Sequence, residues 1–195
     1  PSSGECLRPW AHHPHLHSYS ALYFLNNPGY RTLRKWKTHR GLLFDRQVLK
    51  PNLSLIRALR GFRAHCIVPI PQRFHRAWQM RGSRTTQISQ WLSLQIHAPV
   101  IQALVTSPLR AGHKRQAESS LPERLQNQIR FDFVPGSLSF LDRSTRIILV
   151  DDFMTTGRTL AQGAQVLQRQ GTYEVHAFAL GVRVLKQRLQ LLKSP

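Results

Sequence analysis

One segment in the last third of the chain restricts the fold more than any other. The apolar run 146–150 is followed by two aspartates, a short turn and a helical pattern, and a second apolar run spans 175–180. The order strand, loop, helix, strand predicts a βαβ unit. Strands that are apolar throughout are typical of a parallel sheet covered on both faces. We therefore expect an α/β fold with a parallel sheet flanked by helices.

The rest of the chain has patterns that fit the same class. Apolar residues recur at helical spacing within 30–62, where Pro51 suits a first turn and Gly61 is a stop signal. A second helix is expected at 86–97. A third helix, with Leu160, Ala164 and Leu167 on one face, should end at Gly171, and a short basic helix is expected at 184–193. Short strands are indicated at 64–69, 99–105 and 130–134. Residues 1–29 have no clean period, so we divide the chain into an irregular N-terminal segment, 1–29, and an α/β domain, 30–195.

The length and charge limit the classes of function. The chain has 195 residues, which suits one α/β domain, and its 28 basic against 9 acidic residues give a net charge of +19. A surface this cationic favours polyanions such as nucleic acid, an anionic membrane or phosphorylated small molecules. No apolar run approaches the roughly 20 residues of a membrane span. With only Cys6 and Cys66 and no signal-peptide pattern, we expect a reduced, cytoplasmic protein without membrane insertion.

Two basic or metal-prone regions leave alternatives open. Near Cys6 lie four histidines, which are interpreted as a zinc site, as a solvated arm or as the remnant of a zinc knuckle: His12, His13, His15 and His17. The basic helices carry tryptophans that would either stack on bases of a single strand or lie in the core. These tryptophans are Trp36, Trp78 and Trp91.

The residues after the run 146–150 are suited to a sugar phosphate. Ligands of open parallel sheets bind beyond the carboxyl ends of the strands, where Asp151 and Asp152 are expected. The next turn offers backbone N–H groups, hydroxyls and the positive end of a helix, which together bind anions, and Gly157 lets the backbone approach closely. Carboxylates beside a phosphate site make sense if they accept hydrogen bonds from ribose hydroxyls.

The segment 148–159, Ile-Leu-Val-Asp-Asp-Phe-Met-Thr-Thr-Gly-Arg-Thr, resembles the signature of type I phosphoribosyltransferases, which binds phosphoribosyl pyrophosphate (PRPP). Within that superfamily the chain most resembles the ComF family of competence-associated proteins, over roughly residues 23–183. The supporting segments are 37–41, 68–71 with Arg76 and Arg81-Gly82, Gln116 and 124–127. Of the four-cysteine zinc module common in that family only Cys6 fits here, so the module is lost, degenerate or cut off upstream, and Ser83-Arg84-Thr85 and His113 also depart from the family pattern.

The resemblance implies roles for individual residues. Asp151 and Asp152 would be the catalytic pair and bind the ribose hydroxyls, and 107–128 would be a mobile hood over the site. Mg²⁺ would be bound with PRPP, mostly by ligand and water oxygens, without a dedicated protein cage. The phosphate-binding residues would be Thr155, Thr156, Gly157, Arg158 and Thr159. The pyrophosphate-binding residues would be Ile70, Pro71, Gln72, Arg73, Arg76 and Arg81.

Two functions follow from this resemblance. The first is a PRPP-binding protein that acts in DNA uptake and natural transformation, with single-stranded DNA on its basic surface and partners in the competence machinery. The alternative is an active phosphoribosyltransferase of nucleotide metabolism, which moves phosphoribosyl from PRPP to an unidentified acceptor and releases pyrophosphate. The fold alone does not choose between the two.

Overall fold

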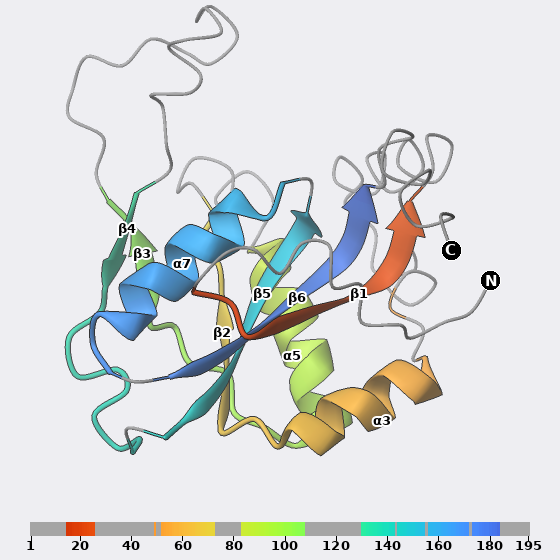
Figure 1. The fold of residues 1–195 in the computed structure, drawn as a ribbon, viewed down its shortest axis with the longest axis horizontal. Helices are drawn as coiled ribbons and strands as arrows, with labels where there is room; N and C mark the ends of the chain where they lie inside the picture. The colour runs from red at the N-terminus through yellow and green to blue at the C-terminus, as the bar shows by residue number, and fades with distance from the viewer. Residues whose placement is uncertain are drawn as a thin grey trace, which may run out of the picture.

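Four parallel strands form the central sheet (Figure 1), in the order β1-β6-β5-β2. The computed structural model describes residues 15–25, 49, 52–72, 83–107, 130–142, 144–154, 156–171 and 173–183. The strands of the sheet are β1 (Ser18–Leu25), β2 (Cys66–Pro69), β5 (Arg146–Met154) and β6 (Glu174–Arg183). β5 pairs with β2 on one side and with β6 on the other, both in parallel. The expected parallel α/β sheet is thus confirmed.

Helices cover both faces of this sheet, as the apolar strands predict. In Figure 1, α7 (Arg158–Gln168) lies on one face, whereas α3 (Leu53–Phe62) and α5 (Arg84–Ile96) lie on the other. Successive residues of β5 serve the two faces in turn. Ile147 and Leu149 belong to the core under α7, and Ile148 and Val150 belong to the core under α3 and α5.

The ends of α3 are set by residues outside its apolar stripe. The side chain of Asn52 caps the first turn, because the Leu55 N–H donates to Asn52 Oδ1 at 3.1 Å. The helix ends at Phe62, the last residue of the expected stretch 30–62 and one residue past the stop signal at Gly61. Arg63 ends it in the left-handed conformation, with φ 51°, and its N–H donates to the Arg60 carbonyl. The rest of the expected helical stretch, 30–48 with Lys37 to Gly41, lies outside the described residues.

Residues 18–25 differ from the expectation of an irregular N-terminal segment, because they form β1. The strand pairs in parallel with β6, with Ser18 opposite His176 and Tyr23 opposite Gly181. Tyr19 and Ala21 enter the core under α7, which explains how a segment with a weak sequence signal is held. The proposed boundary between residues 29 and 30 lies outside the described residues.

A small antiparallel ribbon stands beside the sheet. It consists of β3 (Leu104–Thr106) and β4 (Phe131–Phe133), and α7 lies against β4. The strand expected at 99–105 is therefore mostly wrong: Val100 makes only an isolated bridge to Ile67, and β3 begins later. The strand expected at 130–134 is confirmed. The Ser107 N–H donates to the Arg130 carbonyl, so the ribbon connects the chain on either side of the expected hood, 107–128, of which residues 108–128 lie outside the described part.

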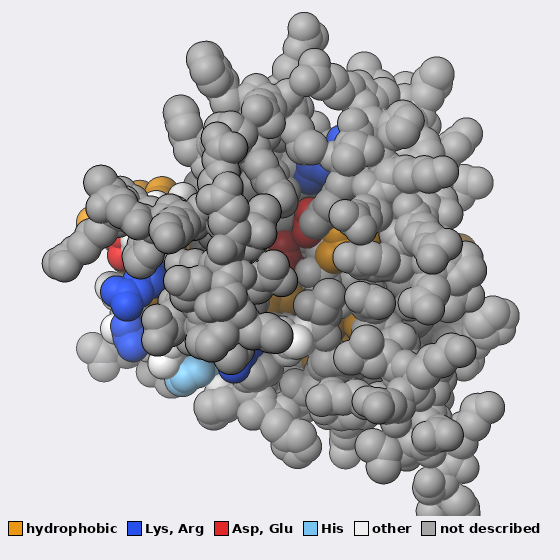
Figure 2. All heavy atoms as spheres, turned by 90° about the horizontal axis from the view of Figure 1, so that it is seen from above, with side chains coloured by type: hydrophobic (Ala, Val, Ile, Leu, Met, Phe, Trp, Pro, Cys, Tyr) orange, Lys and Arg blue, Asp and Glu red, His pale blue; other side chains and the backbone are white. Residues whose placement is uncertain are grey.

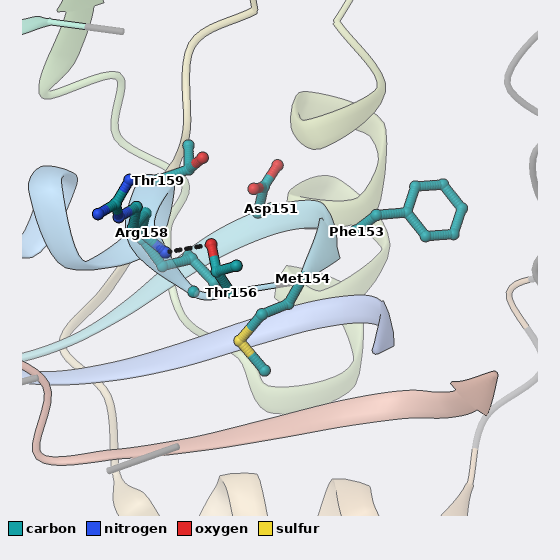
Figure 3. Close-up of a pocket in the computed structure, with 8 residues that line it drawn as sticks. Asp151, Phe153, Met154, Thr156, Arg158 and Thr159 are labelled. Carbon is teal, nitrogen blue, oxygen red and sulfur yellow. Dashed lines mark hydrogen bonds between the residues drawn. The ribbon is translucent and has the colours of Figure 1, made fainter. Parts of the chain in front are cut away.

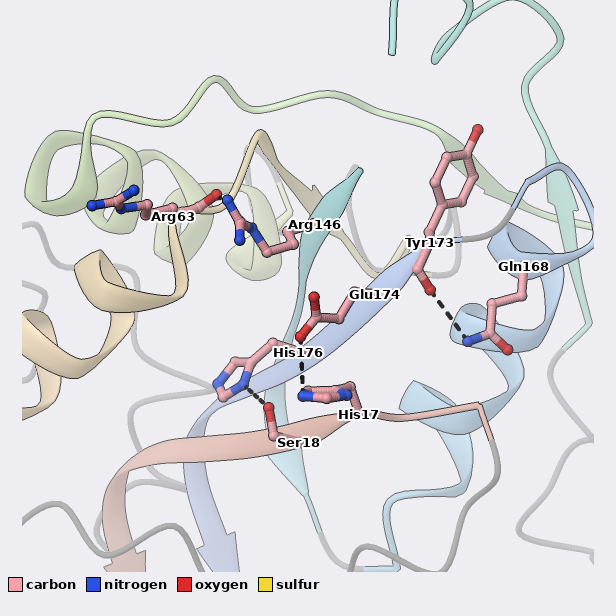
Figure 4. A network of polar contacts seen from close by, with 8 residues as sticks. All are labelled: His17, Ser18, Arg63, Arg146, Gln168, Tyr173, Glu174 and His176. Carbon is pink, nitrogen blue, oxygen red and sulfur yellow. Dashed lines mark hydrogen bonds and ion pairs between the residues drawn. The ribbon is translucent and has the colours of Figure 1, made fainter. Parts of the chain in front are cut away.

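A buried histidine of β6, His176, contacts two serines of β1 (Figure 4). His176 Nδ1 lies 2.6 Å from Ser18 Oγ, and its Nε2 lies 2.8 Å from Ser20 Oγ. A neutral imidazole has one donor and one acceptor, so one serine hydroxyl accepts and the other donates. Burial, with a smaller contribution from the nearby His17, lowers the pKa of His176 to about 4.

The glycine between β5 and α7 generates a first prediction. Gly157 is the N-cap of α7 with φ 73°, whereas Gly61 lies inside α3 with no atom within 4 Å of an added Cβ. Gly157→Ala should lower the free energy of unfolding by about 1–2 kcal/mol because an L-residue is strained there. Gly61→Ala should raise it by about 0.5–1 kcal/mol. Urea titrations measure both free energies of unfolding. A change of the same sign in the two variants would contradict the left-handed conformation assigned to Gly157.

The buried imidazole generates a second prediction. In the unfolded chain a histidine takes up a proton below its ordinary pKa of 6.5, but native His176 does so only near 4. The free energy of unfolding should therefore fall as the pH drops from 6.5 to 4, by about 3 kcal/mol. In His176→Gln this component should be lost.

The control is His97→Asn, an exposed histidine in the left-handed region, where asparagine is tolerated. Urea titrations across this pH range should show the wild-type slope in His97→Asn and a smaller slope in His176→Gln. Equal slopes in the wild type and His176→Gln would refute the prediction.

Candidate functional site

A pocket lies at the edge of the sheet where β5 ends, as the strand signature predicts. Its described lining consists of Asp151, Phe153, Met154, Thr156, Gly157, Arg158, Thr159 and Leu160. In Figure 3 the Asp151 carboxylate and the side chains of Thr156 and Thr159 project in the same direction, while Phe153 and Met154 point away from them. In Figure 2, which looks onto this edge from above, acidic side chains are visible near the centre of the face.

The size of this pocket suits one group of a ligand. Its empty volume, counted out to the open solvent, is about 190 Å³. Because this volume includes open solvent, the enclosed space is smaller, and the described lining residues form a subsite for one group of a ligand rather than for a whole ligand.

The two aspartates occupy different environments. Asp151 is half-buried and lines the pocket, whereas Asp152 is 7% exposed and is not among the described lining residues. Adjacent residues of a strand face opposite sides, which separates their side chains. Each carboxylate accepts a hydrogen bond from the next amide: Asp152 N–H donates to Asp151 Oδ1 at 2.8 Å, and Phe153 N–H donates to Asp152 Oδ1 at 2.7 Å. Joint binding of one ribose by both residues stays a prediction.

The first turn of α7 has the features of an anion site. Gly157 carries no side chain that could cap the helix, and the first turn contains no acidic residue. The first N–H groups of a helix have no partner within the helix, and they carry its positive dipole end. Arg158 is exposed beside them, and the Thr156 Oγ1 lies 3.5 Å from its amide nitrogen. These features favour an anion, and phosphate binding by this turn stays a prediction; Thr155 lies outside the described residues.

The expected pyrophosphate segment is placed only in part. Ile70 follows β2 directly and is 3% exposed, so its side chain belongs to the core. Pro71 and Gln72 are half-buried, and none of the three lines the pocket described above. Arg73, Arg76 and Arg81 lie outside the described residues.

Three lining residues were missed by sequence reasoning. Phe153, Met154 and Leu160 are apolar, and nothing in their spacing indicates a binding role. Phe153 packs on the core under α3 and α5, and Met154 belongs to the core under α7. In residues 147–150 the odd-numbered side chains belong to the core under α7, whereas here the odd-numbered Phe153 belongs to the opposite core. The alternation of side chains along β5 is therefore shifted by one residue around the aspartates. A slip of this kind depends on the packed sheet and has no local sequence signal.

The other expected binding features are placed as follows. Trp91 packs on the core under α3 and α5, in agreement with its core interpretation, while Trp36 and Trp78 lie outside the described residues. Cys6, His12 and His13 are also outside. His15 contacts Gln168 and His17 pairs with Glu174. Within the described ranges no group of three histidine, cysteine or acidic residues could hold a metal, and no helix has the length and apolarity to cross a bilayer.

A curated protein similar in sequence agrees with the resemblance drawn from the signature. No family model matches the chain. It is 30% identical over 116 residues to Competence protein F of Haemophilus influenzae, which covers 58% of this chain and 48% of that protein. The chain thus spans about half the length of this curated relative.

Solved phosphoribosyltransferases are similar at low identity. The purine phosphoribosyltransferase of Pyrococcus horikoshii is 16% identical, with a TM-score of 0.40 over 83% of this chain and 86% of that one. The orotate phosphoribosyltransferase of Aeropyrum pernix is 15% identical, with a TM-score of 0.34 over 86% of this chain and 77% of that one. The fold class rests on the strand order and register given above. In sequence, the chain is similar to Competence protein F over part of its length, in line with the resemblance to the ComF family.

Proposed function

We propose that the chain binds PRPP at the carboxyl edge of its sheet. The observation that carries this proposal is that Asp151 and the first turn of α7 line one pocket. A helix N-terminus without acidic residues attracts a phosphate, and a carboxylate accepts hydrogen bonds from sugar hydroxyls. A ligand with both groups on one pentose satisfies the two halves of the pocket together.

In this proposal the residues have different tasks. Thr156 and Thr159 donate hydroxyl hydrogen bonds to the 5′-phosphate, together with the N–H groups from Gly157 onward. Asp151 accepts a hydrogen bond from a ribose hydroxyl. Asp152 supports the site from within, because its carboxylate holds the Phe153 amide and thereby the backbone that leads into the turn.

A divalent cation fits the donor set of this edge. Mg²⁺ prefers oxygen ligands and keeps several waters, usually with one or two carboxylates and substrate phosphates. Asp151 is a carboxylate in the pocket, so it would hold Mg²⁺ directly or through water. When bound, the ion neutralises charge on the pyrophosphate group of the ligand.

For the cellular role we propose the handling of single-stranded DNA during natural transformation, in the cytoplasm. The support is the similarity to a protein named for competence, together with a net charge of +19. Transfer of phosphoribosyl to an acceptor, with pyrophosphate release, is the alternative. A panel of nucleobases tests it by pyrophosphate release, and release with any base would favour the enzyme over a binding protein.

Ligand binding generates a third prediction. PRPP with Mg²⁺ should raise the Tm, because ligand at a hundred times its Kd stabilises the native state by about 2.7 kcal/mol. Asp151→Asn should remove most of this shift, since it takes away the carboxylate that faces the pocket. Asp152→Asn should lower the Tm without ligand as well, because Asp152 is buried and bonded to the backbone.

The matched control is Asp142→Asn, an exposed aspartate just before the opposite end of β5. Thermal shifts at a series of PRPP concentrations should be the same in this variant and the wild type. A wild-type protein that shows no shift at millimolar PRPP would contradict the proposed function, and so would an unchanged shift in Asp151→Asn.

DNA binding generates a fourth prediction. Affinity for a single-stranded oligonucleotide, measured by fluorescence anisotropy, should fall steeply with salt, with a slope of about −0.7 per phosphate neutralised. A duplex of the same sequence and a neutral-backbone analogue of the strand serve as controls, and the analogue should bind far more weakly. Absence of binding at low salt would refute the role in DNA handling.

A further inference from the structure

The helix layer of α3 and α5 contributes positive charge and no negative charge. No aspartate or glutamate occurs between Asp45 and Glu118, a stretch that contains α3, β2 and α5. The exposed arginines of α3 and of its C-cap are Arg57, Arg60 and Arg63. Residues three positions apart are neighbours on a helix surface, so these side chains gather within about 9 Å along the helix axis.

Backbone contacts hold these arginines in place at the amino end of the sheet. The Arg60 Nε donates to the Gln95 carbonyl at 2.8 Å, which ties α3 to the last turn of α5. Arg146, the first residue of β5, donates from Nε to the Arg63 carbonyl at 3.1 Å. An arginine bound through Nε keeps its terminal N–H groups, which form the fork that contacts phosphate. We call Arg57, Arg60, Arg63 and Arg146 the arginine cluster.

Helix capping explains only part of this cluster. Arg60 and Arg146 bind carbonyls at the C-terminal ends of α5 and α3, where a cation stabilises a helix. The side chains of Arg57 and Arg63, in contrast, form no hydrogen bond or ion pair with any residue of the described part of the chain. In Figure 4 the Arg63 side chain points away from Arg146. These two guanidinium groups therefore have their full binding capacity left for a partner.

One acidic residue lies near the cluster. Glu174 is opposite Arg146 in the pairing of β5 with β6, yet its carboxylate forms an ion pair with His17, at 3.0 Å. A carboxylate at this position reduces the positive potential around Arg146. Arg57 and Arg63 are therefore the members of the cluster on which an experiment should act.

The chemistry of the cluster fits a chain of phosphates. A stacked DNA strand carries one phosphate for about every 3.4 Å, close to the rise of about 4.5 Å between arginines three residues apart on a helix. The described aromatic side chains of this layer are at least half-buried, so the contact is with the backbone of the strand and not with its bases. Membrane docking also uses apolar side chains, but Leu53, the exposed leucine of α3, lies about 15 Å from Arg63 along the helix.

We infer that the arginine cluster is the docking surface for the phosphate backbone of a single DNA strand. The inference rests on the proposed role in DNA handling and assigns that role a place on the molecule. The cluster lies at the amino end of β5 and the pocket at its carboxyl end, with Arg146 and Asp151 about 16 Å apart along the strand. A DNA strand on the cluster leaves the pocket open, so DNA and PRPP bind independently.

The test removes the two arginines whose side chains have no structural bond. Arg57→Gln introduces another good helix former, and Arg63→Asn is tolerated in the left-handed conformation with φ 51°. The matched control is Arg130→Gln/Arg169→Gln, which removes two exposed arginines, one before β4 and one at the C-cap of α7. Both double variants have the same net charge. Fluorescence anisotropy measures the affinity for an oligothymidine strand over a series of salt concentrations.

Arg57→Gln/Arg63→Asn should make the slope of log K against log salt concentration less steep by about 1.4, which is about 0.7 for each lost phosphate contact. Arg57→Lys/Arg63→Lys should keep the wild-type slope, since lysine also neutralises a phosphate. The control should keep the wild-type slope, and PRPP with Mg²⁺ should leave the Kd for DNA unchanged. Equal slopes in Arg57→Gln/Arg63→Asn and in the control would overturn the inference, as would competition between PRPP and DNA.

Two further results separate the inference from the proposed function. A wild type that binds no strand at low salt refutes the role in DNA handling and the inference with it. A wild type that binds DNA, with a slope that Arg57→Gln/Arg63→Asn does not change, refutes only the location. Cosedimentation with vesicles of anionic lipid tests the other polyanion. If the double variant loses vesicle binding and keeps its affinity for DNA, the cluster is a membrane surface and the inference is overturned.

Discussion

The burial of β5 on both faces is the constraint on which the rest of the structure depends. The strand lies between β2 and β6, and its residues from Ile147 to Val150 are fully inaccessible to solvent. A strand buried this way needs a helix layer on each side, which α7 supplies on one face and α3 with α5 on the other. Complete burial ends at Asp151, so the place where the hydrophobic cover stops is also the place where a polar ligand can enter.

The local pattern was sufficient to predict the β5–α7–β6 unit but not β1. The apolar run before Asp151 and the helical spacing after it are contained in one stretch of sequence. β1 instead begins with polar residues, and it is held by partners about 150 positions later: Ser18 and Ser20 bond His176 of β6. No local period records such a contact, so the first strand was expected to be irregular.

The candidate site also combines features that the local sequence predicts with features that depend on the folded structure. The glycine turn and the aspartate beside it follow from residue types alone, because their chemistry is local. The separation of Asp152 from the pocket follows from strand alternation, which the sequence contains. The contribution of Phe153 and Met154 does not, since it depends on a slip in facing that only the packed sheet produces.

The arrangement of the two acids also bears on which ligand the pocket can select. Asp152 is buried, yet its carboxylate accepts the Phe153 amide, and this bond offsets part of the cost of burying a charge. Asp151 keeps a half-exposed carboxylate next to a helix N-terminus. A phosphate at that turn is repelled by Asp151 in any ligand, and a neutral sugar would leave the turn without its anion. In the proposed complex, a hydroxyl of the same molecule that donates to the Asp151 carboxylate offsets part of this repulsion, so a phosphorylated pentose would meet both halves of the pocket at once.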